Sequence, residues 1–263
     1  MDKLKIELHD PVINRLGVDA IIDFYKTIAT ETLEFPGLFV CMTAISDAPF
    51  LNVVIDTRTN EKYDPEIMAT IKNFYNRFNM SWVWFVSPIA KVNHLEQQGF
   101  RLIEQAPGMY FDLTQSLPEI KINQLEIKEA DATDDLSDWT LPLQEGFPSD
   151  DNCEAYRKLN ADLLHKGVTK LKHFVAYIQQ EAVSCATLFV SGDSVMIHNL
   201  ATKIAFQKRG IGKAVSNHLM AVAKNLGVKH CFLDSSDEGF KLYKSLEFKV
   251  YCVARAYELK QSA

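Results

Sequence analysis

The stretch that most constrains this chain is the run from Gln207 to Ala214, which reads Gln-Lys-Arg-Gly-Ile-Gly-Lys-Ala. It follows an apolar, strand-like segment over 195–202 and opens a helix-like pattern over 211–226. Two glycines two residues apart let the main chain bend tightly and approach a ligand with no side chain between them. The helix N-terminus that follows offers unpaired N–H groups and the positive end of its dipole, which together bind phosphate. The run therefore predicts a phosphate-bearing cofactor held by main chain at a strand–turn–helix junction.

Three cations surround this turn and can meet a pyrophosphate: Lys208, Arg209 and Lys213. Two other phosphate motifs are excluded by their spacing. A dinucleotide fingerprint requires a third glycine where this chain has Val215, and the Gly-x-x-x-x-Gly-Lys-Ser/Thr of a P-loop is missing from the sequence. What remains is Gln-x-x-Gly-x-Gly. A basic glycine turn also occurs as a plain surface loop, so the surrounding pattern has to decide.

The pattern downstream supports the cofactor interpretation. Apolar residues recur every three or four positions over 211–226, which predicts a helix with one buried face, and Gly227 ends it. A short strand is expected over 229–234, followed by a helix start at 235–238 with hydroxyl caps and acidic residues.

The next segment, 239–248, completes a second motif. Together with Gln-x-x-Gly-x-Gly it resembles the acetyl-CoA motifs of the GNAT superfamily of acyl-CoA N-acyltransferases, Arg/Gln-x-x-Gly-x-Gly/Ala and Asn-x-x-Ala-x-x-Leu-Tyr-x-x-x-Gly-Phe. Leu242, Tyr243 and Phe248 are retained. Ser236, Gly239 and Glu247 stand where the family has Asn, Ala and Gly. The resemblance covers residues 122–260.

The resemblance implies an acetyl-CoA-dependent N-acetyltransferase whose acceptor is a primary amine of a small molecule or peptide. It places the pantetheine arm on main-chain groups at the end of the fourth strand, where one N–H faces the thioester oxygen; here that stretch is Leu200, Ala201 and Thr202. The coenzyme would further contact Ser236 and the turn formed by Gln207, Lys208, Arg209, Gly210, Ile211, Gly212 and Lys213. Direct attack on the thioester is expected because no cysteine falls near these motifs.

Tyr243 is the candidate general acid, because a phenol near the sulfur can protonate the leaving thiolate. The alternative is a tyrosine packed for structure with its hydroxyl capped. Ser236 either hydrogen-bonds the cofactor or the tyrosine, or simply caps a helix.

His198 is the candidate general base, because its unperturbed pKa near 6.5 suits deprotonation of an ammonium group. It lies two residues after Met196, the position of a carboxylate in many relatives, and so on the same face of the strand, with Asn199 expected on the other face. A buried structural histidine and a water chain to solvent are the alternatives. Asp150 and Asp151 either bind a cationic acceptor or cap a helix.

The chain contains a faint internal repeat. Leu95 to Phe100 resembles Tyr243 to Phe248, with an offset of 148 residues between Gly99 and Glu247. The offset places 50–57 over the strand before the glycine turn, 63–78 over the helix after it, 82–86 over 230–234, and 101–113 over 249–259. Two domains follow, 1–117 and 118–263, joined by a polar linker with a proline.

The first copy has lost the cofactor chemistry. Lys62 and Asp64 stand where Gly210 and Gly212 stand, and Leu95 takes the place of Tyr243. We therefore expect no coenzyme binding in the N-terminal half, and a structural role or a wall of the acceptor pocket instead.

The fold class is α/β: two tandem domains of the GNAT type, each a twisted mixed sheet flanked by helices. In the second half we expect strands at 125–129, 173–178, 183–190, 195–202, 229–234 and 249–259, with helices at 133–144, up to 164, 211–226 and from 235.

The composition of the chain argues against several other classes of protein. The 263 residues carry a net charge of −6, which argues against a nucleic-acid binder. No apolar run reaches membrane-helix length and the N-terminus lacks a signal-peptide pattern, so a cytoplasmic protein is expected. The five cysteines are scattered without zinc spacing, so no metal site is expected. A homodimer through strand edges stays open, as does a non-catalytic coenzyme-binding or interaction module as the rival function.

Overall fold

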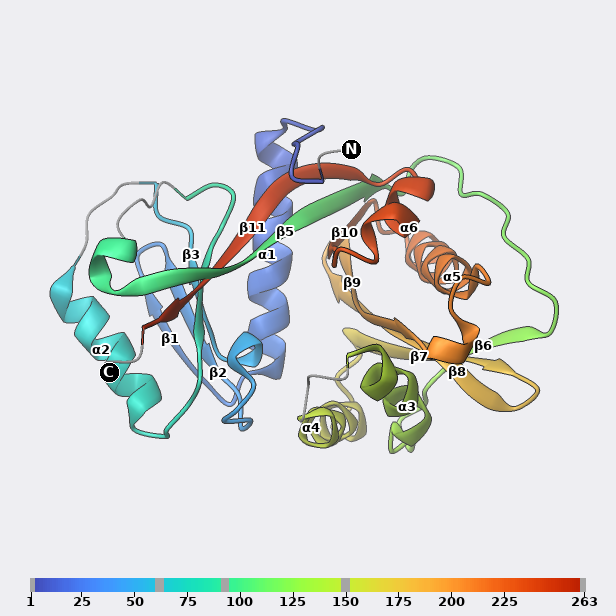
Figure 1. Ribbon diagram of the computed structural model, residues 1–263, viewed down its shortest axis with the longest axis horizontal. Coiled ribbons are helices and arrows are strands. Elements are labelled where there is room, and N and C mark those ends of the chain that lie inside the picture. The colour runs from blue at the N-terminus through green and yellow to red at the C-terminus, as the bar shows by residue number, and fades with distance from the viewer. Residues whose placement is uncertain (1–2, 60–63, 91–94, 148–151, 261–263) are drawn as a thin grey trace. The chain divides into compact units, whose positions relative to one another are not determined.

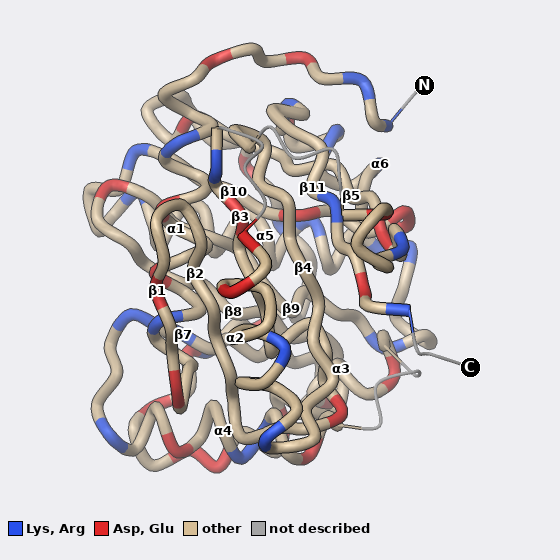
Figure 2. Tube along the Cα trace, turned by 90° about the vertical axis from the view of Figure 1, so that its left-hand side faces the viewer, with Lys and Arg blue, Asp and Glu red and all other residues tan. Residues whose placement is uncertain are grey.

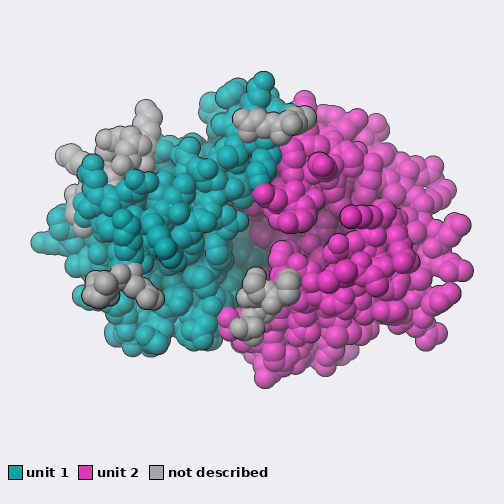
Figure 3. Space-filling model, viewed as in Figure 1, with its two compact units in different colours: residues 1–108, 250–263 teal, residues 109–249 magenta. Residues whose placement is uncertain are grey.

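The computed structural model describes residues 3–59, 64–90, 95–147 and 152–260 and divides into two compact units (Figures 1 and 3). Unit 1 comprises residues 1–108 and 250–263, and unit 2 comprises residues 109–249. The chain therefore leaves unit 1 once and returns to it with its last strand.

Unit 1 is built on a mixed sheet with the strand order β1-β2-β3-β4-β11-β5. Its elements are α1 (Pro11–Ile28), β1 (Glu31–Phe35), β2 (Leu38–Met42), η1 (Pro49–Leu51), β3 (Val53–Asp56), α2 (Pro65–Asn76), β4 (Val83–Val86), η2 (Glu96–Gln98), most of β5 (Phe100–Asp112) and nearly all of β11 (Lys249–Leu259). β3 and β4 run parallel, and β1–β2, β2–β3 and β4–β11 pair antiparallel.

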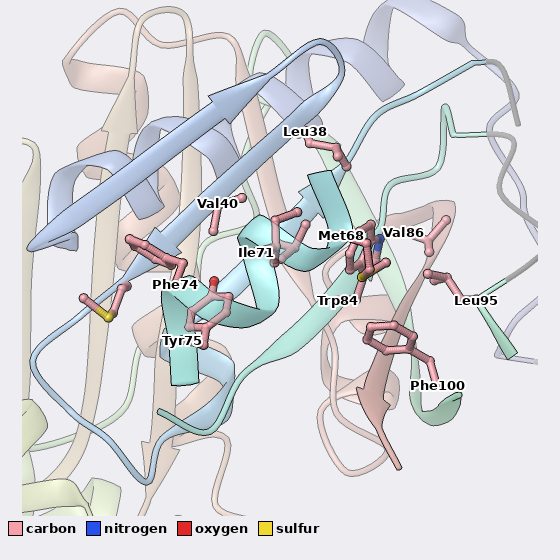
Figure 4. Close-up of a cluster of buried hydrophobic side chains, with 12 residues drawn as sticks. Leu38, Val40, Met68, Ile71, Phe74, Tyr75, Trp84, Val86, Leu95 and Phe100 are labelled. Carbon is pink, nitrogen blue, oxygen red and sulfur yellow. The ribbon is translucent and has the colours of Figure 1, made fainter. Parts of the chain in front are cut away.

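The two long helices of unit 1 cover opposite faces of this sheet. Trp84 of β4 belongs to the core under α2, whose buried members include Ile71 and Tyr75 (Figure 4). The next residue, Phe85, faces the other way and lies 6.5 Å, ring to ring, from Tyr25 of α1. Because neighbouring strand residues point to opposite faces, the sheet is covered on both sides.

Unit 2 repeats this plan with β6 (Leu125–Glu129), α3 (Ser137–Gly146), α4 (Cys153–His165), β7 (Leu171–Ile178), β8 (Glu181–Ser191), β9 (Ser194–Thr202), η3 (Ile204–Phe206), α5 (Ile211–Asn225), β10 (His230–Asp234) and α6 (Phe240–Ser245). Its strand order continues from β5 as β10-β9-β8-β7-β6. His173 of β7 contacts the Trp139 ring of α3, and its neighbour Phe174 contacts His218 of α5. α3 and α5 therefore cover opposite faces.

The last strand of the chain, β11, lies in the sheet of unit 1, and β5 passes from unit 1 into unit 2 after Gly108. β11 pairs with β4 in unit 1, with Tyr257 opposite Trp84. The end of β5 runs beside β10 in unit 2, where the Tyr110 hydroxyl lies 3.0 Å from Nδ1 of His230. The boundary expected at 117/118 stays a prediction, whereas the division into compact units falls within β5, after Gly108, and places residues 250–263 with unit 1.

The mixed α/β fold class is confirmed, and two predicted elements differ in extent. The helix expected from 133 begins at Ser137, because the carboxylates of Asp134 and Asp135 accept hydrogen bonds from the N–H groups two residues on, which favours turns. The strand expected over 50–57 is shortened to β3, since Pro49 opens a 3₁₀ turn.

Acidic and basic residues are interspersed along the trace (Figure 2), and several form ion pairs such as Lys229–Asp193 at 2.9 Å. Among the described residues, no helix combines the length and the apolar composition needed to cross a membrane.

Candidate functional site

The strand that leads to the glycine turn carries a bulge. Thr187 of β8 lies opposite His198, and the register resumes only at Cys185 and Ala201. Two residues of β9 therefore face one residue of β8. Asn199, the first of them, has φ 56°, the left-handed conformation that asparagine tolerates better than most residues.

The bulge overturns one expectation about this strand. Asn199 was expected on the face opposite to His198, but its amide Nδ2 lies 3.4 Å from the hydroxyl of Thr187. Thr187 is the register partner of His198, and partners across an antiparallel pair point to the same face. The prediction was wrong because the extra residue resets the alternation of side chains.

Beyond the bulge, β9 has lost its neighbour on the side of β10. The two strands pair in parallel only over residues 194–196 and 230–232, although β9 continues to Thr202 and both strands lie wholly within the described chain. The opposite edge stays paired with β8 as far as Thr202 and Ser184. Main-chain groups of Leu200, Ala201 and Thr202 thus lie on a strand edge that β10 does not cover, where an extended ligand can bind.

The side chains of Ala201 and Thr202 contact the protein, and so do their carbonyls, since the Ala201 carbonyl accepts from the Ser184 hydroxyl at 2.6 Å and the Thr202 carbonyl from the Gln207 amide at 3.1 Å. Ala201 is buried against Gly146 at the end of α3, where an added Cβ would lie 2.9 Å from the Ala201 Cβ. The Thr202 hydroxyl lies 3.0 Å from that of Ser184. The close approach at Gly146 was not singled out from the sequence, because only the fold brings the end of α3 to β9.

The predicted glycine turn forms the start of α5. Gly210 is the N-cap with φ 80° and ψ 0°, a conformation that favours glycine, and no side chain of the described chain caps the helix. Its carbonyl accepts from the N–H of Ala214, so the N–H groups of the first turn lie ahead of the helical ladder. Such an uncapped helix start is a ready site for a phosphate group.

The residues around the turn hold it in place. The Gln207 amide donates to the Thr202 carbonyl at 3.1 Å, tying the turn to the end of β9. An added Cβ on Gly212 would lie 3.0 Å from Cδ1 of Leu242, so glycine allows α5 to approach α6. The side chain of Ile211 is buried, which leaves only its main chain for a ligand, whereas Lys208 and Arg209 are exposed.

Tyr243 lies on α6 and is buried. Its ring meets that of Phe248 edge-on at 5.6 Å, and burial raises the pKa of its phenol well above the ordinary value, with the Cys231 thiol adding to the shift. An added Cβ on Gly239 would lie 3.1 Å from the Tyr243 ring and 3.3 Å from the Ser236 hydroxyl. Glycine in place of the family's alanine therefore makes room for both groups, and Ser236 also accepts from the Gly239 N–H at 3.1 Å.

The helix that carries Tyr243 ends in a Schellman motif at Glu247. The N–H of Phe248 donates to the Tyr243 carbonyl and the N–H of Glu247 to the Lys244 carbonyl, both at 3.1 Å. Glu247 has φ 68°, although the motif favours glycine at this position. The substitution noted in the sequence thus keeps the turn but places a Cβ in the left-handed region.

His198 lies on β9, three residues before Ala201. Burial lowers the pKa of its imidazole to about 4, so the ring is neutral at physiological pH. The value near 6.5 expected for a base is therefore shifted down by loss of water around the charged form.

The corresponding region of unit 1 differs in both features of the site. β3 and β4 pair along their whole lengths, from Val53 and Val83 to Asp56 and Val86, so no strand edge opens. At the start of α2, the Asp64 carboxylate accepts from the N–H groups of Glu66 at 2.9 Å and Ile67 at 3.3 Å. A carboxylate of the protein thus occupies the position in which a phosphate would bind.

Asp150 and Asp151 lie outside the described residues, as does Lys62. In the described part of the chain, no group of three or more His, Cys, Asp or Glu side chains is arranged to hold a metal ion.

Comparison with known proteins agrees with this geometry. Residues 169–250, which include β9, the glycine turn, α5 and α6, match the family model described as an acetyltransferase (GNAT) domain. This segment of unit 2 is thus similar to the GNAT acetyltransferase domain. No curated protein matches the sequence.

Solved structures share the GNAT fold over most of the chain. A GCN5-related N-acetyltransferase from Kribbella flavida superposes with a TM-score of 0.71 at 10% identity, covering 95% of this chain and 96% of that one. A GCN5-related N-acetyltransferase from Sphaerobacter thermophilus superposes with a TM-score of 0.58 at 12% identity, covering 86% of this chain and 78% of that one. A functionally unknown conserved protein from Staphylococcus epidermidis superposes with a TM-score of 0.57 at 12% identity, covering 90% of this chain and 98% of that one. At these identities the likeness is one of fold.

Proposed function

We propose that unit 2 transfers an acetyl group from acetyl-CoA to a primary amine of a small molecule or peptide. The observation that carries the proposal is the uncapped start of α5 at Gly210, next to a β9 edge that β10 leaves uncovered. Coenzyme A carries a diphosphate and an extended thiol arm. The start of α5 suits the diphosphate, and the uncovered edge of β9 suits the arm.

The coenzyme is bound mainly by main chain in this proposal. N–H groups at the start of α5 and the side chains of Gln207, Lys208, Arg209 and Lys213 take the diphosphate. The pantetheine arm lies along Leu200, Ala201 and Thr202, and one N–H of this stretch polarises the thioester carbonyl. Loss of one such donor typically costs about 3 kcal/mol in the barrier.

Tyr243 serves as the general acid for the departing thiolate. Because burial raises the pKa of the phenol, it stays protonated at neutral and mildly alkaline pH and keeps its proton until the thiolate forms. Ser236, which lies beside the Tyr243 ring around Gly239, orients the ring or the coenzyme.

His198 receives the proton of the acceptor ammonium. With a pKa lowered to about 4 it is a weak base, so in this proposal it relays the proton through water to solvent and does not store it. The acceptor nitrogen attacks the thioester carbon directly. All five cysteines are buried, and burial raises the pKa of the Cys185 and Cys231 thiols, which keeps them protonated and poorly nucleophilic.

Unit 1 takes no coenzyme in this proposal and serves a structural role. Its Asp64 cap would repel a diphosphate, and its paired β3 and β4 offer no open edge.

The test is a screen of primary amines with acetyl-CoA, scored by released thiol, followed by Tyr243→Phe on the best substrate. We expect turnover to fall by about 100-fold or more, the range of general acid catalysis, while the Kd for coenzyme A stays within twofold (about 0.4 kcal/mol). Equal turnover in the variant would remove Tyr243 from the chemistry. Coenzyme binding with no acetylation of any amine would favour the non-catalytic module.

A further inference from the structure

A chain of polar side chains lies under the β9 bulge, between the sheet and the helices α3 and α4. The Asn199 amide donates to the Tyr156 hydroxyl of α4 at 3.1 Å and lies 3.4 Å from the Thr187 hydroxyl. Thr187 in turn lies 2.9 Å from Nδ1 of His173. The bulge is thus bonded through its own side chain to a helix on one face of the sheet.

This chain is set in a largely apolar layer. Tyr156, Thr187 and His173 are all buried, and the Trp139 ring packs against Tyr156 at 5.9 Å and against His173 at 5.1 Å. Buried polar groups are stabilising only while their hydrogen bonds are made, so they fix one arrangement of the groups they join. Here the group they fix is the single left-handed residue of β9.

The position of Asn199 in β9 links the polar network to the proposed site. Asn199 directly precedes Leu200, Ala201 and Thr202, and the bulge begins where β10 has already left β9. A rotation of the Asn199 peptide changes the direction of the next N–H group, and a donor that stabilises developing charge must be held within a narrow range of distance and angle.

We infer that Asn199 and Tyr156 are positioning residues: the Asn199–Tyr156 hydrogen bond holds the β9 bulge so that the main-chain donor after it points at the thioester oxygen. The inference rests on the proposed acetyl transfer. In this inference neither residue touches the reacting atoms, and the diphosphate site at α5 is built without them.

The experiment uses two variants that remove the bond in different ways. Asn199→Gly retains access to the left-handed φ without strain and removes the amide, whereas Tyr156→Phe keeps the ring against Trp139 and removes the hydroxyl. Tyr177→Phe is the control, because it deletes a hydroxyl that bonds Asp138 of α3 at 2.9 Å on the same unit. The full-length chain is assayed for kcat and KM with acetyl-CoA and for the Kd of coenzyme A.

We expect each test variant to lower kcat by about tenfold or more, because a displaced donor loses part of the roughly 100-fold worth of such a group. The Kd for coenzyme A should stay within twofold, and Tyr177→Phe should match the parent in both. An unchanged kcat in both variants, or a rise in the Kd that parallels the loss of kcat, overturns the inference. If the unmodified protein binds no acetyl-CoA, the proposed function is wrong. This outcome differs from an unchanged kcat and from a parallel rise in the Kd, which refute only the inference.

Discussion

Replacing Glu247 with glycine should stabilise the protein. A residue with a Cβ pays roughly 1–2 kcal/mol in the left-handed region, and Glu247 has φ 68° at the Schellman position after α6. Glycine removes that strain. It also raises the conformational entropy of the unfolded chain, which lowers the stability by about 0.4–1 kcal/mol. The side chain is exposed and pairs with no cation within the described chain, so no contact is lost. The net gain is about 1 kcal/mol in the free energy of unfolding.

The chain supplies its own matched comparison at the equivalent position of the first repeat. Gly99 has φ 85°, and the N–H of Phe100 donates to the Leu95 carbonyl at 3.0 Å, as Phe248 does to Tyr243. An added Cβ on Gly99 would meet nothing closer than 4.0 Å, so Gly99→Ala changes only the backbone preference. We expect Gly99→Ala to lower the free energy of unfolding by about 1 kcal/mol, as much as Glu247→Gly raises it.

Urea unfolding followed by tryptophan fluorescence measures both effects, with Glu247→Ala as the control that removes the charge but retains the Cβ. Glu247→Gly should exceed Glu247→Ala by about 1 kcal/mol, or roughly 2–4 °C in Tm for a chain of this size. A glycine variant no more stable than the alanine variant would refute the strain argument.

Three further predictions address unit 2 and its counterpart. For His173, burial lowers the imidazole pKa to about 4 from about 6.5 in the unfolded chain, so only the unfolded chain binds a proton between these values. Stability should fall as pH drops from about 6.5 to about 4, by up to about 1.4 kcal/mol per pH unit, and His173→Asn should flatten this slope in urea titrations at several pH values. His198→Ala should remove a limb of the rate profile centred near pH 4, and an unaltered profile would exclude His198 as the proton acceptor. Asp64→Ala in unit 1 should lose about 1 kcal/mol of stability on removal of the α2 cap, with no change in the Kd for coenzyme A measured by calorimetry.

The sequence was sufficient where short-range chemistry decides the structure. The glycine turn, the face of α5 and the order of elements in unit 2 follow from spacing and from residues with strong conformational preferences, such as Gly210 and Gly227, both of which have positive φ. The internal repeat was readable because each copy ends a short helix with the same turn at Gly99 or Glu247.

The features that the sequence did not predict depend on contacts between distant segments of the chain. A bulge leaves little trace in a strand of apolar and polar residues, so the direction of Asn199 was predicted wrongly. The placement of β11 in the sheet of unit 1 is invisible in the hydrophobic periodicity, because a strand has the same pattern whichever sheet it joins. The low pKa of His198 likewise comes from burial that only the packed unit creates.

Calorimetric titration of acetyl-CoA into the parent chain, Gly210→Asp and Gly192→Asp tests the central claim most directly. Gly192 also has positive φ, at 56°, in the turn before β9, so its variant makes the same chemical change away from the start of α5. A carboxylate about 4 Å from a phosphate costs about 1–4 kcal/mol, so Gly210→Asp should weaken binding at least about fivefold while Gly192→Asp leaves the Kd unchanged. Equal affinity in all three proteins would contradict a diphosphate site at the start of α5.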